Sequence, residues 1–169
     1  NLAEFCLTCH ALSLPGTPHD FRDEQWSYNR PCLPCHTVHN ANLTVTDAPL
    51  WNHDVTEAAY HDLYVGTGTL DAWDVGEPDG PSRLCLSCHD GTIAQASVPD
   101  PADPSGRRMG PFGLSQRANL TSDLSDDHPI SFVYDSALAL QDRELVDPAM
   151  LPREILLDAN DELQCTSCH

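Results

Sequence analysis

Four copies of the motif C-x-x-C-H use every cysteine of this 169-residue chain. The motifs that hold the eight cysteines are Cys6-Cys9-His10, Cys32-Cys35-His36, Cys85-Cys88-His89 and Cys165-Cys168-His169. C-x-x-C-H is the attachment site of a c-type haem, in which both thiols form thioethers and the histidine becomes an axial ligand of the iron. Disulfides or four-cysteine zinc sites would not need a histidine after every second cysteine. The sequence therefore predicts four covalent haem c groups, with zinc and disulfides as the alternatives.

The segments between the motifs have the composition of loops. Fourteen prolines and nine glycines are spread along the chain, and few windows show helical or alternating periodicity. We expect a single domain over 1–169, mostly irregular with a few short α-helices and wrapped around a chain of haems. Because such segments cannot build a conventional core, the porphyrins are expected to supply most of the apolar interior.

Two stretches nevertheless favour a helix, 55–65 and 135–143. In the first, Thr56 is the expected cap, and the side chains expected to face inward are Ala59, Tyr60 and Leu63. Short turns are also expected to follow each motif, because the geometry of C-x-x-C-H suits one turn of helix.

The charge balance excludes several classes of partner. The net charge is -18, from 26 acidic residues against eight arginines and no lysine. Such a chain offers no basic patch for nucleic acid or for an anionic membrane, and no apolar run approaches the roughly 18 residues of a membrane span. Because haem attachment to C-x-x-C-H takes place outside the cytoplasm, we expect an exported protein from which any secretory signal has been removed.

The histidine count suits haems with two histidine ligands each. Nine histidines are present, and the five outside the motifs are His19, His39, His53, His61 and His128. Four irons need four distal ligands, so the residues alone leave one histidine spare. The two methionines are weaker candidates: Met109 lies in a glycine-proline loop, and Met150 is expected to pack against a haem.

Six segments together resemble a known family, and the resemblance covers most of the chain, with its weakest stretch at 99–125. They are "TPHDF" (17–21), "CLPCHTVHNA" (32–41), "PLWNHD" (49–54), "CLSCHDGTIA" (85–94), "DDHPISFVYD" (126–135) and "LQCTSCH" (163–169). In this order they are similar to exported multihaem cytochromes with C-x-x-C-H motifs, and within these to the tetrahaem cytochromes that polymerise into extracellular nanowires in metal-respiring microbes.

The resemblance implies haems stacked in a continuous chain, and it implies that the distal ligands are His19, His39, His53 and His128. His61 is then the spare histidine. By sequence order, His19, His53 and His128 would serve the first, second and third motifs. His39 follows the second motif too closely to reach the far side of that haem. We therefore expect His39, or failing it His19, to ligate the haem at His169 in the next copy of a head-to-tail homopolymer.

These features predict electron transport without catalysis, because an iron with two histidine ligands has no open position for a substrate. The expected partners are further copies of the chain, other redox proteins and extracellular metal acceptors, and the expected location is an extracellular filament. A discrete periplasmic shuttle has the same chemistry and is the alternative. A multihaem reductase is the other alternative, but the absence of lysine excludes those reductases that replace the motif histidine with lysine.

Overall fold

The computed structural model describes most of the chain, namely residues 14, 16–23, 27, 30–46, 48, 50–60, 63–64, 70–72, 75–92 and 115–169. The first motif (Cys6, Cys9 and His10), His61 and Met109 lie outside these residues. Within them the chain is mostly irregular, with short helices and one small sheet, which confirms the coarse prediction of little regular structure. No helix in this part of the chain has the length and apolarity needed to cross a membrane.

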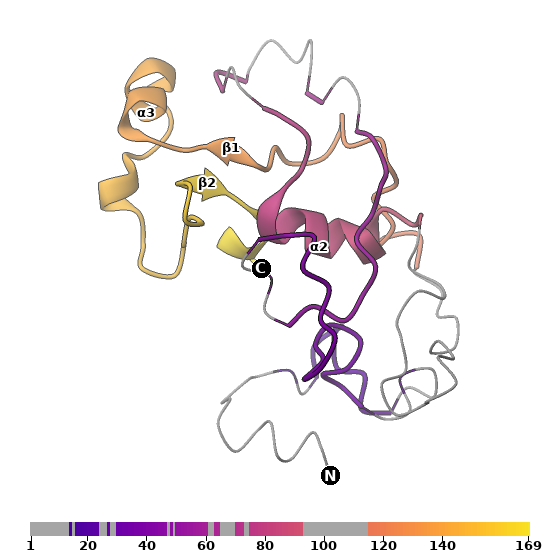
Figure 1. The fold of residues 1–169 in the computed structure, drawn as a ribbon. Coiled ribbons are helices and arrows are strands. Elements are labelled where there is room, and N and C mark those ends of the chain that lie inside the picture. Colours follow the sequence, from indigo (N-terminus) through magenta and orange to yellow (C-terminus); the bar gives the residue numbers. More distant parts are fainter. Residues whose placement is uncertain are drawn as a thin grey trace.

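The regular elements lie at the centre and at one end of the molecule (Figure 1). In chain order they are α2 (Gly80–His89), β1 (Phe132–Val133), α3 (Ser136–Asp142), the 3-10 helix η2 (Pro148–Met150), β2 (Glu162–Leu163) and the 3-10 helix η3 (Cys165–Ser167). The two strands pair antiparallel, with Phe132 opposite Leu163. In Figure 1, α2 occupies the middle, β1, β2 and α3 lie to one side of it, and much of the indigo N-terminal part of the described chain runs below it as loops.

The predicted helix at 135–143 is confirmed as α3, and its ends have local causes. Asp135 is the N-cap, and its side chain accepts a hydrogen bond from Leu138 N at 2.8 Å. Arg143 ends the helix in the left-handed conformation, with φ of 67°. Capping by a neighbouring carboxylate and termination by a left-handed residue are both encoded within a few positions, so this helix could be read from the sequence.

The predicted helix at 55–65 is wrong. Its described residues, 55–60 and 63–64, contain no helix. The backbone N–H of Thr56 donates to Ser87 Oγ at 3.0 Å, and that of Tyr60 donates to Glu77 Oε2 at 2.9 Å. Bonds to distant residues thus replace the i→i−4 bonds of a helix, because burial against α2 outweighs local propensity. Tyr60 and Leu63 are buried as predicted, whereas Ala59 is exposed.

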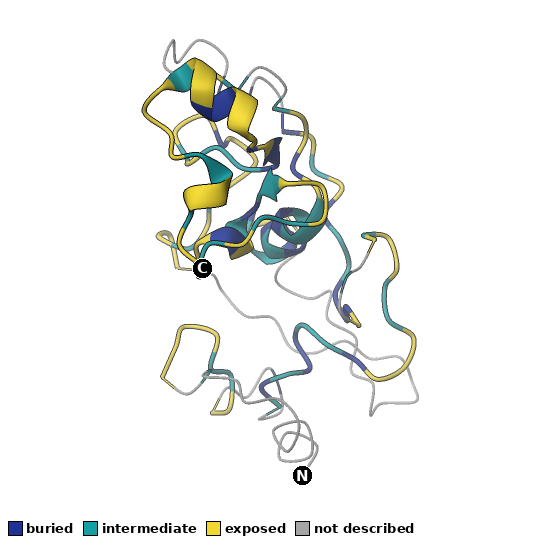
Figure 2. Cartoon of the chain, turned by 90° about the vertical axis from the view of Figure 1, so that its left-hand side faces the viewer, coloured by how far each residue is buried: buried dark blue, intermediate teal, exposed yellow. Residues whose placement is uncertain are grey.

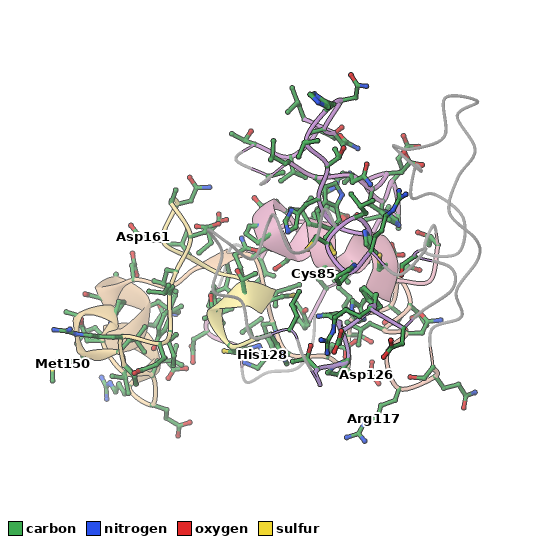
Figure 3. All side chains as sticks on the ribbon, turned by 90° about the horizontal axis from the view of Figure 1, so that it is seen from below. Cys85, Arg117, Asp126, His128, Met150 and Asp161 are labelled. Atoms are coloured by element: carbon green, nitrogen blue, oxygen red, sulfur yellow. The ribbon has the colours of Figure 1, made fainter. Side chains whose placement is uncertain are left out.

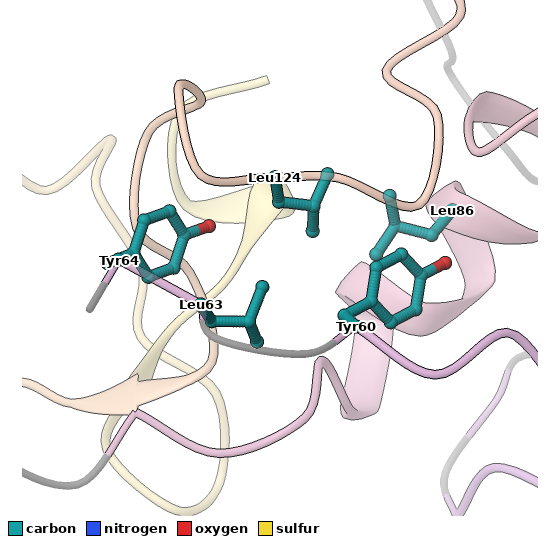
Figure 4. Packing of buried hydrophobic residues seen from close by; sticks show 5 residues of the cluster. All are labelled: Tyr60, Leu63, Tyr64, Leu86 and Leu124. Atoms are coloured by element: carbon teal, nitrogen blue, oxygen red, sulfur yellow. The ribbon is translucent and has the colours of Figure 1, made fainter.

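Two small apolar clusters supply a protein core, so the expectation that the chain cannot build one was too strong. The first cluster (Figure 4) packs one face of α2 and contains Tyr60, Leu63, Tyr64, Leu86 and Leu124. The second lies between the sheet and α3 and contains Phe132, Tyr134 and Leu138. Figure 2 shows the contrast between the helices, since every residue of α2 is buried or half-buried while α3 exposes most of its surface.

Candidate functional site

The three described C-x-x-C-H motifs share one local structure, a single helical turn. In the second motif, the backbone N–H of His36 donates to Cys32 O at 2.8 Å. The third motif is the last part of α2, and the fourth forms η3, with the N–H of His169 bonded to Cys165 O at 3.1 Å. Residues at i, i+3 and i+4 share one face of a helical turn. Each of these three motifs therefore presents two thiols and an imidazole on one side.

The tertiary structure brings the third and fourth motifs together. The backbone N–H of Cys165 donates to Ser82 Oγ at 2.9 Å, which joins η3 to the first turn of α2. Gln164 is 2% exposed and accepts from Ser82 N at 3.3 Å, which ties the same two elements a second time. The two turns thus converge from positions about 80 residues apart in sequence.

The pKa values of the motif thiols are shifted by their burial and by their closeness to one another. Burial raises the pKa of Cys35 to about 11 and that of Cys88 to about 12, and the proximity of Cys35 contributes to the latter. The Cys85 thiol donates to Cys165, which raises the pKa of Cys85 and lowers that of Cys165. None of the six described cysteines forms a disulfide. Cysteines of the second, third and fourth motifs therefore form one neighbourhood.

Three histidines are oriented by the same kind of hydrogen bond, from Nδ1 to a backbone carbonyl oxygen. The Nδ1 atoms of His53, His89 and His128 lie 2.7, 2.8 and 2.7 Å from backbone carbonyl oxygens, those of Asp54, Ala118 and Pro129 respectively. A carbonyl can only accept, so Nδ1 carries the proton and Nε2 keeps its lone pair in the neutral ring. Histidines that ligate metals are oriented by this kind of second bond. One of the three is a motif histidine, and the other two are predicted distal ligands.

His53 lies between the second and third motifs. It is 1% exposed, and its Nε2 is 3.6 Å from Cys88 Sγ. The backbone N–H of the preceding Asn52 donates to Cys35 O at 3.0 Å. Sequence order assigned His53 to the second motif, and the structure adds the third motif as a neighbour.

His19 lies beside the third motif, although sequence order assigned it to the first. Its ring centroid is 5.9 Å from that of His89, with the rings at 73°. Burial lowers the pKa of His19, and the nearby His89 and His169 lower it further. One metal ion between two imidazoles separates the centroids by about 6 Å, because each metal–nitrogen bond is about 2 Å and each nitrogen lies about 1 Å from its centroid. The separation of His19 and His89 matches this spacing.

The two remaining distal candidates are exposed. His39 lies just beyond the second motif, in a loop pinned by Thr37, whose Oγ1 donates to His39 O at 2.8 Å. His128 is exposed, and its carbonyl accepts from Tyr64 OH at 3.1 Å. Figure 3 shows Cys85 and His128 near the middle of the molecule and Met150 at one end. Met150 is 74% exposed, and its expected packing against a haem stays a prediction.

Asp90 was missed from the sequence, although it directly follows the third motif. This carboxylate is 3% exposed and accepts hydrogen bonds from Tyr60 OH at 2.7 Å and Thr56 Oγ1 at 2.5 Å on one oxygen. Its other oxygen accepts from Thr92 N and Oγ1, both at 2.8 Å. The sequence "DGT" is enough to predict the Asx turn from Asp90 to Thr92. The hydrogen bonds from the distant Tyr60 and Thr56 could not be predicted from it. Asp90 fixes the end of α2 beside His89.

Trp51 was also missed as a candidate. Its side chain is 7% exposed, and its indole Nε1 is the one buried side-chain nitrogen or oxygen that lacks a hydrogen-bond partner in the described part of the chain. Leaving such a donor unpaired costs about 1–3 kcal/mol. A group with an acceptor oxygen at this position would remove that cost.

These residues fit a covalently attached haem. Each described motif offers thiols and an imidazole on one helical turn, two predicted distal histidines have Nε2 directed away from a carbonyl-bound Nδ1, and a buried donor awaits an acceptor. Among the described residues, no three histidine, cysteine or acidic side chains are arranged to hold a metal ion by themselves. That finding does not bear on haem, since the porphyrin supplies four of the iron's ligands and the protein only the axial ones.

No protein-family model matches this chain, and no curated protein shows significant similarity to it.

Proposed function

We propose that this chain is an electron-transfer protein that carries four covalent haem c groups, one at each C-x-x-C-H motif. The observation that carries the proposal is the combination of a common helical turn at three motifs with the carbonyl-bound Nδ1 of His53, His89 and His128. The turn presents the attachment groups together, and the hydrogen bonds leave Nε2 as the ligating nitrogen.

The chain's own residues would hold and isolate the cofactors. The cysteines form the thioether attachments, the motif histidines are the proximal ligands, and the distal ligands are His19, His39, His53 and His128. When bound, each haem supplies one-electron exchange at its iron. Two imidazoles per iron leave no open position, which favours transfer over catalysis, and they favour a lower potential than a methionine ligand would give. A reductase would instead need one iron short of a ligand.

The placement of His19 changes one assignment made from sequence order. We assign His19 and His89 as the axial pair of the third haem, because their centroid separation of 5.9 Å suits one iron between them. His39, His53 and His128 then remain for the first, second and fourth haems. With His19 engaged in its own chain, His39 is favoured over His19 as the ligand between subunits.

The surface positions of His39 and the fourth motif support polymerisation. His39 is exposed on its loop, and both Cys168 and His169 are exposed at the other partner of the proposed junction. A ligand from one copy to the haem of the next is a heterologous contact, and repeating it without closure gives an open filament. In this proposal the filament is exported and extracellular, and it passes electrons to other redox proteins or to metal acceptors outside the cell.

The first test is to produce the chain in a host that attaches c-type haems. We expect a mass increase equal to four haems and purely low-spin spectra in the oxidised protein. A chain that carries no haem would refute the proposed function. A strong high-spin signal would favour the reductase.

His39→Ala tests the junction, with His61→Ala as the matched control. We expect His39→Ala to lose filaments in negative-stain microscopy and to convert one of the four haems from low to high spin. His61→Ala should keep both the filaments and four low-spin haems. If the unaltered protein is a uniform single-copy particle in size-exclusion chromatography, the discrete periplasmic shuttle replaces the filament.

A further inference from the structure

Trp51 is held firmly against the second motif by the backbone on both of its sides. His36 and Trp51 form an isolated antiparallel bridge. The N–H of Thr37 donates to Leu50 O at 2.8 Å, and Trp51 O accepts from Asn42 N at 2.7 Å. The position of the indole is therefore fixed by the same loop that forms the second C-x-x-C-H turn.

The Trp51 indole lies on the same side of the second motif as the His36 imidazole. Residues opposite each other in an antiparallel pair project to the same face, so the side chains of His36 and Trp51 share a face. The ring of His53, two residues further on, has its centroid 6.1 Å from that of Trp51. A group ligated by His36 would thus meet the Trp51 indole, whose N–H is buried and lacks an acceptor in the described residues.

We propose that the Trp51 indole N–H donates a hydrogen bond to a propionate of the haem held by Cys32, Cys35 and His36. This inference rests on the proposed function and goes beyond it, because it names a further cofactor-binding residue and the carboxylate that it binds. The chemistry suits this chain. Four haems bring eight propionates into a protein with 26 acidic residues and eight arginines, so neutral donors must serve where cations are few. An indole N–H is a donor only, which suits a carboxylate.

The test compares Trp51→Phe with Tyr134→Phe in the fully loaded protein, by resonance Raman spectroscopy of the propionate bending bands. Tyr134→Phe removes one polar atom from another buried aromatic residue, whose hydroxyl donates to Val146 O far from the motifs in sequence. We expect Trp51→Phe to shift the band of one haem and Tyr134→Phe to shift none. Loss of the donor also leaves more negative charge near that iron, so the midpoint potential of one haem should fall in Trp51→Phe alone.

A second measurement needs no variant. In the unaltered protein transferred to D₂O, one propionate band should shift slowly, because the donor is buried and exchanges slowly with solvent. Trp51→Phe that keeps four haems by mass while all propionate bands and potentials stay unchanged would overturn the inference and leave the proposed function intact. Absence of haem from the unaltered protein would instead refute the proposed function itself.

Discussion

Two regions of this molecule are stabilised in different ways. The segment 131–163, which contains β1, α3, η2 and β2, has no cysteine or histidine and packs an ordinary apolar cluster of Phe132, Tyr134 and Leu138. The region around α2 and the second motif also has an apolar cluster, but it buries several polar side chains beside it, among them His53, Thr56 and Asp90. The first region is packed by its own apolar side chains. The second region orients thiols and imidazoles and contains one indole N–H without a hydrogen-bond partner among the described residues. Such an arrangement is expected of a protein whose interior a cofactor would complete.

The largest expected effect comes from breaking the polar region at Asp90. Asp90→Ala leaves the hydroxyls of Tyr60 and Thr56 without their buried acceptor, and each buried donor left unpaired costs about 1–3 kcal/mol. Chemical denaturation of the loaded protein measures this loss. Asp123→Asn, which alters an exposed carboxylate bonded within its own turn, should change the free energy of unfolding by less than about 0.5 kcal/mol. Equal effects of the two substitutions would show that the Asp90 network does not stabilise the fold.

Leu138→Ala breaks the other region. Leu138 is 7% exposed in the second cluster, and truncation of a buried leucine costs about 2–5 kcal/mol. We expect a value near the lower end, because this cluster is small, and we expect the low-spin haem spectrum to be unchanged. Leu140→Ala is the matched control on the same helix, since Leu140 is 79% exposed. A changed haem spectrum in Leu138→Ala would mean that the two regions are not separate in the way that their packing indicates.

The smallest expected effect is on how stability depends on pH, through the carboxyl of Glu162 in β2. Burial, followed by the nearby Asp79 and Asp158, raises the pKa of Glu162. A raised pKa in the folded state means that Glu162 contributes stability below its ordinary pKa of 4.5 and loses it as pH rises through the folded value. Glu162→Gln should therefore flatten the fall in thermal stability between about pH 4.5 and pH 7. Asp161→Asn removes the same charge from an exposed neighbour and should leave that slope in place. An unchanged slope in Glu162→Gln would assign the pH dependence to another group.

Local features of the sequence determined more of the site than of the fold. The C-x-x-C-H spacing was enough to predict a helical turn at each motif, because both bonds and shared face arise within five residues. The helix α3 was also predicted, and its ends depend on Asp135 and Arg143, which act on backbone groups a few positions away. Little regular structure elsewhere followed from the prolines and glycines.

Other features of the molecule were decided by tertiary contacts between residues far apart in the chain. The segment from Thr56 to Tyr60 is extended because α2 and Glu77 supply its hydrogen bonds, and no helical pattern within the segment could reveal that. The nearness of His19 to His89, 70 positions later, is likewise a product of the fold, because neighbours in space need not be neighbours in the chain. The sequence by itself determined which residue types are available at the motifs and how each turn presents them. Only the folded chain decided which turns meet, which imidazoles approach one another and which buried donor, at Trp51, has no hydrogen-bond partner among the described residues.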